Sequence, residues 1–208
     1  MLAAIALIPI LLAVAVALSS ERLAPGEGPP FLAQVTQNGL FTGFTAMLLA
    51  LPLFLPLTVS VVAGDTIAGE AGLGTLRYLL ISPVGRVRLL VMKYLASLVF
   101  ILAGTFTLMI AGAAIGAILF PVGPVTLLSG FTISIFEAFG RMALVALYTT
   151  VSLSGMAAVG LFISTLTTVP VGAMTATLVT SGVSNILGNI PQLEWMHSWL
   201  FTYYWLDF

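Results

Sequence analysis

Apolar residues gather along this chain in long blocks, and polar residues, glycine and proline gather between the blocks. Each block has close to the roughly 20 residues that an α-helix needs to cross a lipid bilayer. Five blocks are found, at about residues 2–18, 40–63, 94–120, 142–166 and 169–187. The pattern predicts an all-α membrane protein, a polytopic helical bundle with five spans visible.

Prolines and glycines mark the boundaries of these blocks. Residues 19–38 contain the run PGEGPP, which cannot continue a helix and should connect the first two spans outside the hydrocarbon. Pro52 and Pro56 lie four residues apart in the second block, where they should kink the helix. Pro121 and Pro124 should end the third span.

The composition supports lipid as the main solvent of the chain. Of its 208 residues, 60% are hydrophobic and 6% are charged, whereas a soluble domain carries about 25% charged residues. The net charge of -1 offers no basic stripe for a phosphate backbone, so we expect no nucleic-acid partner. Cysteine is absent, which excludes disulfides and thiolate metal sites.

Most of the positive charge lies in one loop. The chain has six lysines and arginines, and four of them fall within residues 64–93, between the second and third spans: Arg77, Arg86, Arg88 and Lys93. The positive-inside rule places this loop in the cytoplasm. The N-terminus is then also cytoplasmic, and the aromatic segment 188–208 is external.

The first part of that loop has an amphipathic pattern. Leu73, Leu76 and Leu80 recur at helical spacing from Asp65 onward, which predicts a short surface helix near the membrane plane. Arg86, Arg88 and Lys93 follow and could reach the lipid headgroups as membrane anchors. The simplest interpretation is a basic loop that sets the topology and binds only anionic lipid.

A more specific interpretation comes from a resemblance. Residues 69–94 resemble the segment E..G.GTL..LL..P..R..LL..K of the ABC-2 family of ABC-transporter permeases, through Glu70, Gly74-Thr75-Leu76, Leu79-Leu80, Ser82-Pro83, Arg86, Leu89-Leu90 and Lys93. A weaker similarity covers the whole chain. Ala71 departs from the family, which commonly has Arg or Lys there. The family has six spans, so residues 1–208 would be a single transmembrane domain that is incomplete at both ends.

The resemblance implies a function and a set of roles. The chain would be a non-catalytic permease subunit of an ATP-driven exporter in a bacterial cytoplasmic membrane. The cytoplasmic segment would be a coupling helix that docks on a separate ATP-binding subunit, through Glu70, Leu73, Thr75, Leu76, Arg77 and Tyr78. That partner would use ATP and Mg²⁺, and the permease itself would bind no cofactor. A second permease subunit, identical or homologous, would complete the path for a lipophilic or amphipathic substrate.

Three further features of the sequence have separate interpretations. Glu137 and Arg141 are spaced four apart and form a candidate external ion pair. Gly112 and Gly116 form a GxxxG motif, for which close packing within one bundle is favoured over a dimer seam. The single histidine, His197, favours a structural role at the interface over metal binding, which needs more ligands.

Two other classes of protein stay open. A secondary transporter would be expected to bury ionisable residues inside its spans, and the five apolar blocks contain none at their cores. A structural membrane protein whose basic loop only sets topology is compatible with the pattern. An intramembrane enzyme is disfavoured, because no nucleophile and base, and no metal set, can be assembled at membrane depth.

Overall fold

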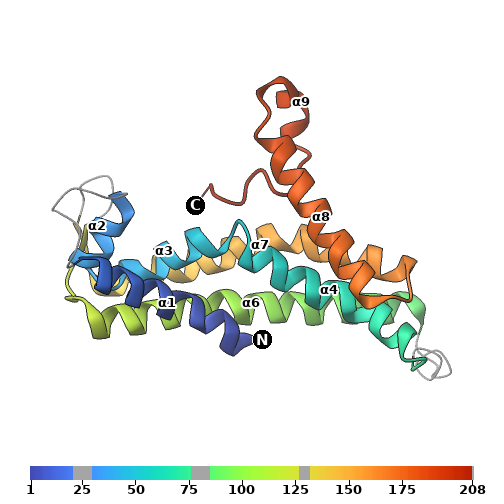
Figure 1. Cartoon of the computed structure of the whole chain (residues 1–208), viewed down its shortest axis with the longest axis horizontal. Helices are drawn as coiled ribbons and strands as arrows, with labels where there is room; N and C mark the ends of the chain where they lie inside the picture. The colour runs from blue at the N-terminus through green and yellow to red at the C-terminus, as the bar shows by residue number, and fades with distance from the viewer. Residues whose placement is uncertain (21–29, 76–84, 127–131, 208) are drawn as a thin grey trace. The chain divides into compact units, whose positions relative to one another are not determined.

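The computed structural model describes residues 1–20, 30–75, 85–126 and 132–207 (Figure 1). The regular structure of the described residues is helical, except for a two-residue antiparallel ladder that pairs β1 (Val125–Thr126) with β2 (Thr132–Ile133). The helices are α1 (Leu2–Ser20), α2 (Pro30–Gln37), α3 (Phe41–Ala50), α4 (Phe54–Gly72), α6 (Arg86–Leu119), α7 (Ile135–Leu166), α8 (Pro170–Gly188), η1 (Pro191–Leu193) and α9 (Glu194–His197).

Candidate membrane spans are fewer than the five that the sequence predicts. In the described residues, α6, α7 and α8 are long and apolar enough to cross a membrane, and the pair α3 and α4 makes a fourth if it counts as one broken span. The apolar part of α1, Leu2–Leu18, is shorter than these helices. The helical nature of the chain is therefore confirmed, with three or four candidate spans.

Two helices begin well before their apolar blocks. α6 starts at Arg86 and α7 at Ile135, whereas the hydrophobic pattern predicts starts near residues 94 and 142. A helix does not end where its apolar face ends, because polar residues with ordinary helix propensity continue the backbone hydrogen bonds outside the bilayer. Arg86, Arg88 and Lys93 consequently lie inside α6 and not in a loop.

The two prolines of the second block act at different places. The helix stops before Pro52, and residues 51–53 separate α3 from α4. Pro56 lies in the first turn of α4, where its missing N–H removes no helical bond. Thr58 donates to the carbonyl of Phe54 at 2.8 Å in the same region. The predicted kink is thus a break at one proline.

The described contacts divide the chain into two compact units. The first unit contains Met1–Pro52 and Ala103–Leu147, and the second contains Leu53–Leu102 and Tyr148–Phe208. In the first unit α1, α2 and α3 pack on one another. In the second, α4 packs along α8, as Figure 1 shows, and α9 follows the far end of α8.

The GxxxG motif of α6 packs within the first unit. A Cβ on Gly112 would lie 2.7 Å from the Cα of Gly43, and a Cβ on Gly116 would overlap the carbonyl oxygen of Gly39. Gly39 and Gly43 have the same spacing as Gly112 and Gly116, so two small-residue stripes cross with their backbones in contact. The interpretation of this motif as packing inside one bundle is confirmed.

Candidate functional site

Of the residues predicted to couple the chain to a partner, Glu70, Leu73 and Thr75 lie at the end of α4, and the structure ends that helix in a well-defined way. Leu73 is the C-cap, and Gly74 follows in the left-handed region with φ +70°. The N–H of Gly74 donates to the carbonyl of Ala71 at 3.1 Å, and the N–H of Thr75 donates to the carbonyl of Glu70 at 2.9 Å. These two bonds form a Schellman motif, in which glycine is favoured because it has no Cβ.

This ending corrects one boundary of the sequence analysis. The amphipathic pattern predicts that a separate surface helix begins at Asp65, but residues 65–72 continue α4 without a break. An amphipathic stretch and the end of a longer helix have the same spacing of leucines, so the pattern cannot tell them apart. Residues 76–84, with Leu76, Arg77, Tyr78 and Leu80, lie outside the described residues.

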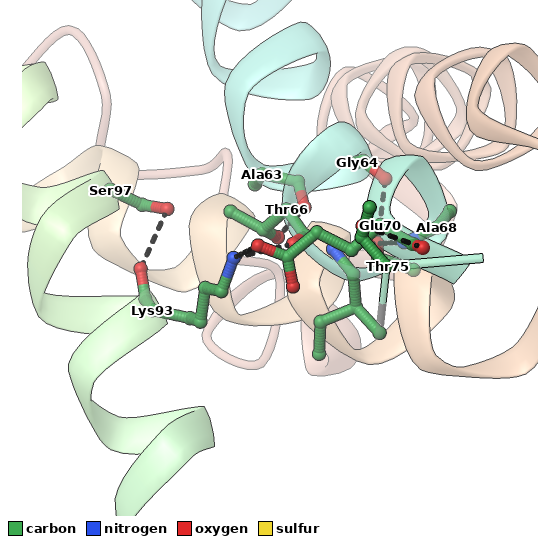
Figure 2. A network of polar contacts seen from close by, with 10 residues as sticks. Ala63, Gly64, Thr66, Ala68, Glu70, Thr75, Lys93 and Ser97 are labelled. Atoms are coloured by element: carbon green, nitrogen blue, oxygen red, sulfur yellow. Dashed lines mark hydrogen bonds and ion pairs between the residues drawn. The ribbon is translucent and has the colours of Figure 1, made fainter. Parts of the chain in front are cut away.

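An ion pair joins the end of α4 to α6. Lys93 Nζ contacts Glu70 Oε1 and also donates to the carbonyl oxygen of Thr66 at 2.9 Å, as Figure 2 shows. The two side chains are 23% and 29% exposed, so most of each lies away from solvent. Charges in such surroundings attract more strongly than surface charges and are screened less by salt. The pair therefore fixes α6 against the last turns of α4.

One oxygen of this carboxylate has no partner in the described part of the chain. Glu70 Oε2 is buried and makes no hydrogen bond there. A carboxylate can accept several hydrogen bonds, and Lys93 occupies only the other oxygen. Glu70 thus keeps one acceptor free among the described residues, next to the segment that the resemblance identifies as a docking element.

The remaining predicted site residues are not gathered at one place. The hydroxyl of Thr75 donates to the carbonyl of Glu70 at 3.1 Å and helps to close the helix end, while Leu73 is exposed. Arg86 and Arg88 are exposed in the first turn of α6, and Lys93 is paired with Glu70.

The predicted pair in α7 is formed and lies in the other unit. Arg141 and Glu137 form an ion pair at 3.3 Å, with about half of each side chain exposed. Their i,i+4 spacing near the start of α7 accounts for the contact.

Two polar residues at the α4 end were not predicted. Thr66 supplies the carbonyl that Lys93 binds, and Ser164 of α7 makes three hydrogen bonds to the backbone of α4. A serine inside an apolar block that faces a neighbouring helix is a signal for such a contact, but the sequence does not say which helix faces it.

The segment after α8 is held by the second unit. His197 Nε2 donates to the carbonyl of Ile190 at 3.1 Å, and its ring stacks on Tyr203 with centroids 5.0 Å apart. Trp205 donates from Nε1 to the carbonyl of Ser152 at 3.3 Å. Within the described ranges no three His, Cys, Asp or Glu residues gather as metal ligands. The hydrogen bond and the stacked ring of His197 hold the turns of this segment together.

The described helices define a class of protein: a helical chain with three or four stretches long and apolar enough to cross a membrane. The model of one protein family, described as a protein of unknown function (DUF2705), matches residues 7–205, and the chain belongs to that family. No curated protein and no solved structure matches the chain.

Proposed function

We propose that this chain is a permease subunit of an ATP-driven exporter of the ABC-2 type. The proposal is supported by the motif in residues 69–94, which resembles that family, and by the candidate spans on both sides of it. The chain carries no phosphate-binding loop of the form GxxxxGK[ST], so the energy of ATP has to reach it from another subunit. The coupling segment, within residues 64–93, is the element that receives it.

The observation that carries the proposal is the ion pair between Glu70 and Lys93. Glu70 lies near the end of α4 and Lys93 near the start of α6, so the pair ties together the two helices that the segment connects. A force applied to a loop is dissipated when the helices on its two sides move independently. Because this ion pair joins the two helices, a displacement of the segment moves the end of α4 and the start of α6 together.

The proposal specifies partners and surroundings. Two permease subunits, identical or homologous, pair with two ATP-binding subunits that use ATP and Mg²⁺, in a bacterial cytoplasmic membrane with the N-terminus in the cytoplasm. The few charged side chains of the chain and its many apolar, serine and threonine side chains favour a lipophilic or amphipathic substrate, such as a drug, an antibiotic or a lipid. Efflux assays with the purified complex in liposomes test this class, and export of a hydrophilic polymer alone would contradict it.

The proposal is tested by purifying the tagged chain in mild detergent from the membranes of its own cells. We expect a second chain with a GxxxxGK[ST] loop to co-purify, identified by mass spectrometry. Arg77→Gln removes one charge from the segment and should reduce that yield several-fold. Arg88→Gln removes the same charge from the exposed side of α6 and is the matched control. A pure permease without such a chain, or equal loss in both variants, would leave the basic loop as a topology signal.

A further inference from the structure

One hydroxyl group of α7 is built into the backbone of α4, about one turn before Glu70. Ser164 is fully buried, and its Oγ accepts hydrogen bonds from the N–H groups of Ile67 at 3.1 Å and Ala68 at 2.9 Å. The same hydroxyl donates to the carbonyl of Gly64 at 2.6 Å. Figure 2 shows Gly64 and Ala68 on α4 beside Glu70.

The backbone groups that Ser164 binds are neighbours in the hydrogen-bond pattern of α4. In an α-helix the N–H of Ala68 and the carbonyl of Gly64 are the two ends of one i→i−4 hydrogen bond. A hydroxyl that binds both ends stands across one step of the hydrogen-bond ladder of α4. Insertion of a side chain into this ladder is an established cause of helix bending. The hydroxyl also uses its full capacity of one donor and two acceptor sites.

Small residues bring the backbones together one turn further from the helix ends. A Cβ on Gly160 of α7 would lie 2.8 Å from the Cβ of Ala63, and a Cβ on Gly64 would lie 2.9 Å from the Cα of Met174 in α8. The contact at Gly160, against the Ala63 Cβ and the methyl group of Thr177, depends on close packing. It can therefore persist as a pivot while the polar contacts beside it exchange.

We propose that Ser164 is a releasable latch between the ends of α4 and α7. In the latched state the hydroxyl holds the α4 backbone as described above. In the unlatched state the end of α7 swings away about the Gly160 crossing. The N–H groups of Ile67 and Ala68 then bond the carbonyls of Ala63 and Gly64 within α4, and the Ser164 hydroxyl bonds the Gly160 carbonyl of its own helix. Both states pair every one of these buried polar groups, so the exchange avoids the penalty of an unsatisfied group.

The role of the latch in transport rests on the proposed function, because the coupling segment is proposed to move α4. The end of α4 is the element that the coupling segment moves, and the latch determines whether α7 follows that movement. The two states themselves are a property of this chain and can be measured without any ATP-binding subunit. The failure of one proposal is therefore distinguishable from the failure of the other.

Spin-label distances between the two helix ends test the latch. The chain has no cysteine, so labels on introduced cysteines at Leu73 and Leu166, which are 82% and 69% exposed, need no prior removal of native thiols. A swing of roughly 25° over the roughly 9 Å from Gly160 to Leu166 displaces the label by about 4 Å. We expect Ser164→Ala in lipid nanodiscs to move most of the distance distribution outward by about this amount.

A matched serine on α4 serves as the control. Ser60 is as buried as Ser164, but its hydroxyl donates at 2.7 Å to Leu57 within its own helix, so Ser60→Ala should leave the distribution unchanged. An unchanged distribution in Ser164→Ala, or an equal shift in Ser60→Ala, would overturn the latch. If Ser164→Ala does not fold, Ser164→Thr and Ser164→Val repeat the comparison at equal size, with the hydroxyl as their only difference in hydrogen bonding.

Discussion

Replacing Lys93 by methionine removes one charge of the ion pair and keeps a side chain of similar length. Exposed ion pairs contribute about 0–1 kcal/mol, and removal of one partner from a fully buried pair costs about 3–5 kcal/mol. The side chains of Lys93 and Glu70 are about a quarter exposed, so the coupling lies between these limits. The hydrogen bond to the carbonyl of Thr66 is lost as well. We estimate that Lys93→Met lowers the free energy of unfolding by about 2 kcal/mol.

Thermal unfolding in detergent, followed by intrinsic fluorescence, measures this loss. For a chain of this length about 1 kcal/mol corresponds to roughly 2–4 °C, so Lys93→Met should lower the Tm by about 4–8 °C. Arg88→Met removes the same charge from an exposed position on the same helix and should change the stability by no more than about 0.5 kcal/mol.

A double-mutant cycle separates the ion pair from other effects of the substitution. Glu70→Gln removes the partner charge, and the double variant should lose about 1 kcal/mol less than the sum of the two single variants. A Tm for Lys93→Met equal to that of Arg88→Met would show that the ion pair does not stabilise the chain. Additive losses in the cycle would refute the predicted coupling, because they would show that the two charges do not interact.

Three further predictions concern the rest of the chain. Gly116→Ala should lower the free energy of unfolding by about 3 kcal/mol, because its Cβ overpacks the backbone crossing. Gly140→Ala meets open space in α7 and should raise the free energy of unfolding by up to about 1 kcal/mol. The Tm values of the two variants test both changes. Gly74→Ala should cost about 1 kcal/mol because a Cβ strains the left-handed backbone, and the Tm again reports it. In variants that keep a single tryptophan, Trp195 should be quenched by acrylamide or brominated lipid far more than the buried Trp205.

The spacing of residues along one helix predicted contacts correctly, and the spacing between helices did not. Glu137 and Arg141 are one turn apart, so their ion pair follows from helical geometry alone. Glu70 and Lys93 are 23 residues apart and belong to different helices. Their contact depends on how α4 and α6 lie against each other, and a single sequence contains no direct record of that register.

Helix boundaries show a similar division. The apolar blocks predicted the cores of α6, α7 and α8, because apolar side chains have to leave water. They missed the first turns of α6 and α7, where charged residues such as Arg86, Arg88 and Glu137 interrupt the apolar pattern but helix propensity continues the backbone hydrogen bonds. The end of α4 was predictable in principle, since Gly74 directly follows a helical run and glycine favours the left-handed cap.

A photo-crosslinking residue in place of Leu73 tests directly whether the coupling segment contacts an ATP-binding subunit. Leu73 is exposed at the base of the proposed coupling segment, and Val122, past the opposite end of α6, is an exposed control. On irradiation of intact cells, we expect position 73 to form an adduct with a chain that carries a GxxxxGK[ST] loop, and position 122 to form none. An absence of such an adduct at position 73, or equal adducts at both positions, would contradict the account.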